Sequence, residues 1–166
     1  MTRPGVFLLI MLAGCNDEPA GKAPVGHHPT DSAFERVQSR GHTAMGVDQY
    51  TSSHRFEPLA DGGRIALQRD PTDSAGVAQI RTHMGVIAGA FSRGDFSLPG
   101  FVHDRDVPGT AVMTARRSRI IYAADSLPGG GQVRLQSSDP AAVAAIHDFL
   151  AFQRRDHRSP AHGTAQ

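Results

Sequence analysis

The chain has 166 residues, which is enough for one domain with short extensions. Its 17 lysines and arginines are nearly balanced by 16 aspartates and glutamates, and this balance excludes the strongly basic surface that is typical of nucleic-acid-binding proteins. Hydrophobic residues make up 39% of the chain, which allows a buried core, but no apolar run after residue 15 is long enough to span a bilayer.

The N-terminal segment MTRPGVFLLIMLAGC predicts a lipoprotein signal peptide. One positive charge, Arg3, precedes the apolar run 6–12, and small residues follow that run, as in secretory signals. The end of the segment, Leu-Ala-Gly-Cys, resembles the bacterial lipobox, in which the cysteine carries the lipid and begins the mature protein. We therefore predict a signal peptide over residues 1–14, a lipid anchor on Cys15 and a place in the bacterial cell envelope. Asn16, in place of the aspartate that retains lipoproteins in the inner membrane, favours the periplasmic face of the outer membrane.

The composition divides the mature chain into three parts. Residues 15–33 hold proline, glycine and small polar residues without apolar periodicity, which predicts a flexible tether. Residues 159–166 have the same character and predict a disordered tail, so a single folded domain is expected over residues 34–158. Because Cys15 is the only cysteine in the chain, disulfides and cysteine metal ligands are excluded.

Two stretches of this domain share a strand–turn–strand–helix pattern. The sequence DGGRIALQ matches the later GGGQVRLQ, and AGVAQIRTHM matches AAVAAIHDFL. Ile65 and Leu67 alternate with polar neighbours, and the later stretch repeats this period of a half-buried strand. The glycine-rich turns are typical of tight hairpins. We therefore expect hairpins near residues 54–69 and 119–137.

A helix is expected after each hairpin, near residues 74–91 and 140–155. Asp139 followed by Pro140 is a strong helix start, with an N-cap residue and a proline at the first helical position. One ββα unit is too small to bury its own apolar face. We predict an α+β fold in which two ββα repeats form a four-stranded antiparallel sheet, with both helices packed on one face.

The connection between the two repeats, residues 92–118, is long for a compact domain. Connections of this length are usually functional or disordered. Phe96, Phe101 and Val102 indicate that this one packs against the domain.

Several motifs resemble a family of small secreted bacterial proteins. The segments MGVDQYTSSHRF, FSRGDFSLPGFVH and AAIHDFLAFQRRDH follow that family's Met-Gly-x-Asp-Gln opening, its Gly-Asp-Phe connection and its helix ending in Asp-His. Over residues 34–158 the resemblance implies a shared fold and shared His and Met positions. Some members carry an aspartate carbamoyltransferase label, but this chain lacks that enzyme's carbamoyl-phosphate motif. Arg55 and Met84 depart from the pattern, which has a second His and an aliphatic residue at these places.

The side chains with metal-ligating chemistry fall in the segments that this pattern covers. They are His42, Met45, His54, His83, His103, Met113, His147 and His157. Imidazole combined with thioether suits copper in an oxidising compartment, whereas imidazole alone also suits zinc. No pair has the close spacing that would identify the metal.

We predict a pocket with the segment 42–54 as one wall and the connection 92–118 as the other. The predicted ligands of a copper ion are His54, His83, His103, Met45 and Met113. Asp48 and Gln49 are predicted to orient an imidazole through its other nitrogen.

Two other function classes remain open from the sequence. A non-enzymatic binding module for a partner protein or a haem-like ligand is one, although the CxxCH attachment site of haem is absent. A small enzyme that uses a His–Asp pair such as His103 and Asp104 is the other. No Gly-x-Ser-x-Gly motif is present, so the metal-binding envelope protein is the leading prediction.

Overall fold

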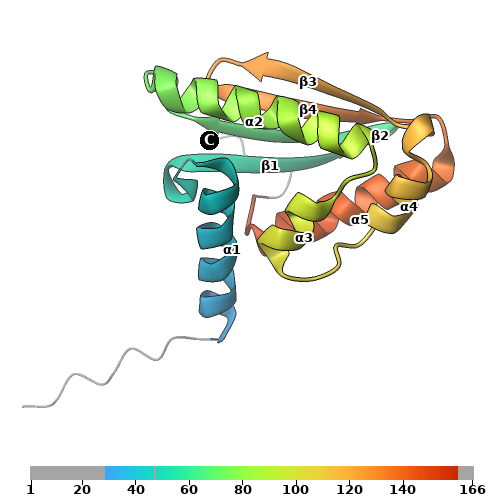
Figure 1. The fold of residues 1–166 in the computed structure, drawn as a ribbon, viewed down its shortest axis with the longest axis horizontal. Coiled ribbons are helices and arrows are strands. Elements are labelled where there is room, and N and C mark those ends of the chain that lie inside the picture. Colours follow the sequence, from blue (N-terminus) through green and yellow to red (C-terminus); the bar gives the residue numbers. More distant parts are fainter. Residues whose placement is uncertain (1–28, 47, 161–166) are drawn as a thin grey trace, which may run out of the picture.

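The computed structural model describes residues 29–46 and 48–160, and these residues form an α+β domain with a four-stranded antiparallel sheet and five α-helices (Figure 1). The signal segment, Cys15 and the chain up to residue 28 lie outside the described residues. The strands are β1 (Ser52–Leu59), β2 (Gly62–Arg69), β3 (Ile121–Leu127) and β4 (Gly130–Gln136). The α-helices are α1 (Pro29–Met45), α2 (Ser74–Ser92), α3 (Ser97–His103), α4 (Thr110–Ala115) and α5 (Pro140–Asp156).

The sheet has the order β1-β2-β4-β3, with every neighbouring pair antiparallel. Both hairpins form where the alternating apolar residues predicted them. Gly62 at the start of β2 has a φ of 135°, and a Cβ at this position would lie 2.2 Å from the carbonyl oxygen of Leu135. Glycine is therefore required where β2 and β4 approach each other. The predicted antiparallel sheet is confirmed, whereas the relation between the two ββα units stays a prediction.

Helices α2 and α5 cover the same face of the sheet. Each begins at an aspartate whose carboxylate accepts a backbone N–H of the first turn, Asp73 for α2 and Asp139 for α5, as N-cap residues do. Gly63 of β2 faces side chains of α5, and Gly131 of β4 faces Met84 of α2. The register of β2 with β4 places both glycines on one face of the sheet. Each helix contacts the strands of the other hairpin, because α2 packs on β3 and β4 and α5 packs on β1 and β2.

The hydrophobic core fills the layer between the sheet and these helices. Its largest fully buried side chains are Phe91, Phe149, Leu67, Ile80, Met84, Met113, Leu135, Ile146, Leu150 and Val133. Phe91 packs edge-on against Phe149, with ring centroids 5.8 Å apart. Aromatic contacts therefore join α2 to α5 across the core.

The connection between the hairpins is largely helical rather than extended. It contains α3 and α4, of which α3 packs against α1 and α4 against α5. Residues 49–51 and 117–119 form short 3-10 helices before β1 and β3. The long connection therefore packs onto the domain through residues such as Phe96 and Val102, whereas Phe101, which we also expected to pack, is 49% exposed.

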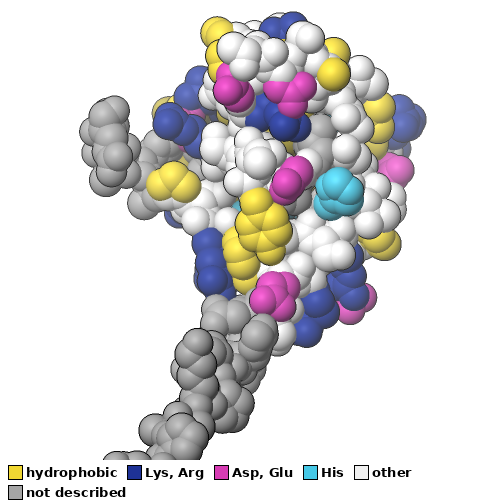
Figure 2. Space-filling view, turned by 90° about the vertical axis from the view of Figure 1, so that its left-hand side faces the viewer, with side chains coloured by type: hydrophobic (Ala, Val, Ile, Leu, Met, Phe, Trp, Pro, Cys, Tyr) yellow, Lys and Arg dark blue, Asp and Glu magenta, His cyan; other side chains and the backbone are white. Residues whose placement is uncertain are grey.

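Helix α1 begins at Pro29, upstream of residue 34, where we expected the folded domain to start. The end of the predicted tether is therefore helical. In the part of the chain that the structure describes, no helix is both long and apolar enough to cross a membrane. On the face shown in Figure 2, acidic and basic side chains are interspersed and hydrophobic side chains form only small groups.

Candidate functional site

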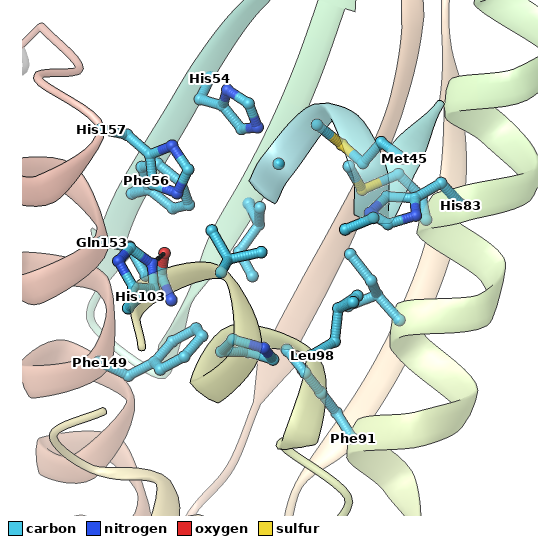
Figure 3. A pocket seen from close by; sticks show the side chains of 17 residues that line it. Met45, His54, Phe56, His83, Phe91, Leu98, His103, Phe149, Gln153 and His157 are labelled. Carbon is cyan, nitrogen blue, oxygen red and sulfur yellow. Dashed lines mark hydrogen bonds between the residues drawn. The ribbon is translucent and has the colours of Figure 1, made fainter. Parts of the chain in front are cut away.

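A small cavity lies where α1, β1, α2, α3 and the end of α5 meet. Its volume is about 80 Å³. Most of its lining is apolar, and its potential ligand side chains are Met45, His54, His83, Met84, His103, Gln153 and His157. We call it the histidine cavity. Figure 3 shows His54, His157, His103 and Gln153 along one side and Met45 and His83 on the opposite side.

Regular secondary structure positions most of these side chains. His54 projects from the inner face of β1, where it pairs with the fully buried Leu67 of β2. His83 lies on α2 directly before the buried Met84. Met45 is the last residue of α1. The cavity therefore exists only when elements distant in the sequence have packed together.

Three imidazoles form a continuous group on one side of the cavity. The ring centroids of His54 and His157 are 4.7 Å apart, and those of His103 and His157 are 5.2 Å apart. His54 also stacks on Phe56 at 5.7 Å. Close packing of this kind fixes the positions of the imidazole rings without using their nitrogens.

Burial keeps several of these imidazoles neutral. Burial, and to a smaller extent the charge of His83, lowers the pKa of His54 to about 4. Burial also lowers the pKa of His83 to about 4. The pKa of His157 is lowered well below its usual value, first by burial and then by His54 and His103. Neutral imidazole is the form that binds metal ions.

The ring nitrogens of the four histidines differ in their partners. The His103 side chain is fully buried, with Nδ1 2.9 Å from Oδ2 of Asp156 and Nε2 2.8 Å from Oε1 of Gln153. In contrast, Nδ1 of His157 is buried and has no hydrogen-bond partner among the described residues. Within residues 29–46 and 48–160, no hydrogen bond engages the ring nitrogens of His54 or His83 either. A buried polar group without a partner, such as His157 Nδ1, is uncommon and indicates a missing ligand or water.

Most of the predicted site residues come together in this cavity. Met45, His54, His83 and His103 all line it, and the segment 42–54 and the connection 92–118 both contribute to its walls. These four side chains therefore share one cavity, whereas their binding of a metal ion stays a prediction.

The other predicted site residues lie elsewhere. Met113 on α4 is fully buried in the hydrophobic core and does not line the cavity. Asp48 caps the 3-10 helix before β1, where its carboxylate accepts the backbone N–H of Tyr50 at 2.8 Å. The side chain of Gln49 is outside the described part of the structure.

The predicted ligand set omitted three residues that contribute to the site. His157 is a candidate in the sequence by residue type only, and Gln153 is absent from the predicted set although it lines the cavity. Asp156 binds His103 and also pairs with Arg105 at 2.6 Å. Asp156 and His157 form the terminal Asp-His of the family pattern, and this motif is the sequence signal for both residues.

The geometry limits what the cavity can hold. No three His, Cys, Asp or Glu side chains within the described ranges are arranged so that they could hold a metal ion. A complete zinc site built from such ligands alone is therefore not preformed. The volume of about 80 Å³ is also far below the roughly 300–1,000 Å³ of pockets for larger organic ligands. The cavity fits a single ion or a few water molecules better than it fits haem.

Comparison with known proteins gives no relative: no family model, curated protein or solved structure matches the chain. The resemblance to the family of small secreted bacterial proteins remains an expectation from the quoted motifs. The function has to be inferred from the residues of the site.

Proposed function

We propose that the protein binds one Cu(I) ion in the histidine cavity and works in the bacterial cell envelope, anchored by a lipid on Cys15. The observation that carries this proposal is the convergence of four imidazoles and the thioether of Met45 on one small, mostly apolar cavity. Cu(I) accepts imidazole nitrogen together with thioether sulfur. Such a site does not need three histidines or carboxylates in one place.

The unpaired nitrogens favour particular ligands. His54 and His83 are neutral because of burial, and neither ring uses its nitrogens in a hydrogen bond within the described ranges. Met45 lies beside His83 in Figure 3. We therefore propose His54, His83 and Met45 as the ligands. His157 stacks on His54 and lies outside this set.

His103 has a different role in this proposal. Both of its ring nitrogens already have partners, Asp156 and Gln153. Neither nitrogen is left to bind a metal ion, so His103 is not a ligand in this proposal. His103 instead fixes the position of His157, whose ring it contacts edge-on.

Titration of the metal-free protein with Cu(I) against a competing chelator tests this function. The wild type should bind one ion, and His83→Ala or Met45→Ala should weaken binding by roughly 10–100-fold. His147→Ala is the matched control, because His147 bonds the carbonyl of Leu59 and does not line the cavity. Absence of binding, or equal affinity in all four proteins, would reject the proposed site.

A second candidate function is acid–base chemistry at His103. The specific observation that favours it is the 2.9 Å contact between His103 Nδ1 and the Asp156 carboxylate, since a carboxylate orients the imidazole of many general bases. The two candidates differ in their dependence on His103. Under the copper proposal, His103→Ala should weaken Cu(I) binding less than His83→Ala does.

We further propose that the fold arose by duplication of a ββα unit. The hairpin registers support this. Residue 53 pairs with residue 68 in the first hairpin, and residue 121 pairs with residue 136 in the second. A shift of 68 positions therefore relates the register of the first hairpin to that of the second. Ile65 and Val133, which the same shift relates, pair with each other at the centre of the sheet. Separate chains of residues 29–95 and 96–160 should be unfolded alone and should fold when mixed, since each helix packs on the other unit's strands. Independent folding of either chain would contradict this.

A further inference from the structure

A second hollow lies between α1 and the C-terminal end of α5. Its volume is about 460 Å³, within the range of roughly 300–1,000 Å³ that is typical of small-molecule pockets. Five arginines line it, namely Arg36, Arg40, Arg105, Arg155 and Arg158. We call it the arginine groove.

Positive charge exceeds negative charge in the arginine groove. Its lining contains only two carboxylates, Asp104 and Asp156. Asp104 pairs with Arg40 at 2.9 Å. Asp156 pairs with Arg105 and is shared with His103. Arg36 and Arg155 have no carboxylate partner among the described residues, so they give the lining a positive charge that attracts an anion.

Aromatic rings hold several of these guanidinium groups in place. The Cζ atoms of Arg105 and Arg155 lie 4.8 and 5.6 Å from the centroid of the same ring, Phe152. Arg158 lies over Phe34 at 4.4 Å. Cation–π contacts of this kind reduce the side-chain freedom that would be lost on binding.

The backbone of the groove is unusual at two positions. Asp104 and Arg158 have φ values of 55° and 50°, and they are the only non-glycine residues with positive φ in the described part of the chain. Both line the arginine groove. Asp104 is the C-cap of α3 and Arg158 follows the C-cap of α5, where left-handed residues commonly end helices. These φ values therefore place the ends of two helices at the groove.

We propose that the arginine groove binds the phosphate group of an anionic ligand. The planar guanidinium group donates paired hydrogen bonds that match the geometry of phosphate oxygens. The groove shares His103 with the histidine cavity, and its other lining residues are separate. The phosphate has two sources in a cell envelope, a soluble phosphate compound or the headgroup of an anionic lipid.

The test uses the metal-free mature chain with Cys15→Ala, so that neither copper nor a lipid anchor contributes. Calorimetric titration with inorganic phosphate and pyrophosphate measures soluble ligands. Co-sedimentation with phosphatidylglycerol vesicles, compared with phosphatidylcholine vesicles, measures headgroup binding. The test variant is Arg36→Gln/Arg155→Gln. The matched control is Arg55→Gln/Arg93→Gln, which removes the same charge from exposed arginines outside the groove.

The proposal predicts binding in one of the two arms and a loss of roughly 10-fold or more in the test variant, the scale of hydrogen bonds to charged groups. The control variant should keep the wild-type affinity. Binding of pyrophosphate identifies a soluble ligand, and binding only to phosphatidylglycerol identifies a headgroup. No binding in either arm, or equal weakening in both variants, would overturn the proposal. Because no metal is present, these outcomes are independent of copper binding.

Discussion

The imidazole rings of His54 and His157 stack with their centroids 4.7 Å apart, although His54 belongs to β1 and His157 follows α5. Phe56 completes this group, with its centroid 5.4 Å from that of His157. The histidine cavity therefore depends on contact between β1 and the residue that follows α5. Its properties can be tested through stability as well as through metal binding.

The stability of the metal-free protein should fall on mild acidification. The pKa of His54 and of His83 is about 4 in the folded state and 6.5 in the unfolded state, so the unfolded chain takes up protons first. The contribution of these two neutral imidazoles to the free energy of unfolding is complete above pH 6.5 and is lost as the pH falls toward 4. Urea unfolding should show a decrease of roughly 2 kcal/mol or more in the free energy of unfolding.

Two variants separate this effect from general acid sensitivity. His54→Phe removes one titrating group and keeps an aromatic ring stacked on Phe56. The free energy of unfolding of this variant should therefore depend less on pH than that of the wild type. His147→Gln should keep the wild-type profile, because His147 lies outside the cavity. Identical profiles for wild type and His54→Phe would contradict the neutral, buried state of His54.

The affinity for Cu(I) should change little between about pH 7.5 and 5.5. Histidine sites usually lose metal below the normal imidazole pKa, because the ligands must be deprotonated. His54 and His83 are neutral well below that value, so no proton has to leave them. Competition titrations at several pH values would measure this. A steep loss of affinity beginning near pH 6.5 would show that the ligands are ordinary exposed histidines.

Met45 and Met113 should respond differently to substitution by alanine. Met113 is fully buried in the core, so Met113→Ala should lower the free energy of unfolding by about 2–5 kcal/mol. The Cu(I) affinity of Met113→Ala should match that of the wild type. Met45→Ala should weaken Cu(I) binding, with a smaller effect on unfolding because Met45 is only half-buried. The reverse pattern would make Met113 the ligand.

Cys15→Ala should release the protein from membranes. The Leu-Ala-Gly-Cys sequence predicts that this cysteine carries the lipid, and its removal leaves a chain without an anchor. Cell fractionation with acyl labelling of the wild type would measure both properties. Membrane association of the variant, together with an unlabelled wild type, would argue against the lipoprotein prediction.

The sheet and its two main helices were predictable because their signals are local. Ile65 and Leu67 alternate with polar residues, and Asp139 with Pro140 marks a helix start. Helix α1 was missed because its sequence is mostly small and polar. Its docking against α3 comes from tertiary packing, which a local pattern does not contain.

The site was predictable only where side-chain direction follows from regular structure. His54 on a strand and His83 on a helix could both be placed toward the interior. His157 reaches the cavity on the face of α5 that also carries Phe149 and Gln153, and its backbone N–H bonds the carbonyl oxygen of Gln153. This spacing of four residues is a helical signal that the predicted ligand set did not use. Met113 has the chemistry of a ligand, but the short helix α4 turns it into the core.

X-ray absorption spectroscopy of the Cu(I)-loaded protein tests the central claim most directly, because it identifies the atoms bound to the metal. The wild type should show copper bound to imidazole nitrogen and to one sulfur. Met45→Ala should lose the sulfur signal, and Met113→Ala should keep it. Copper bound without sulfur, or a wild-type spectrum that is unchanged in Met45→Ala, would contradict binding in the histidine cavity.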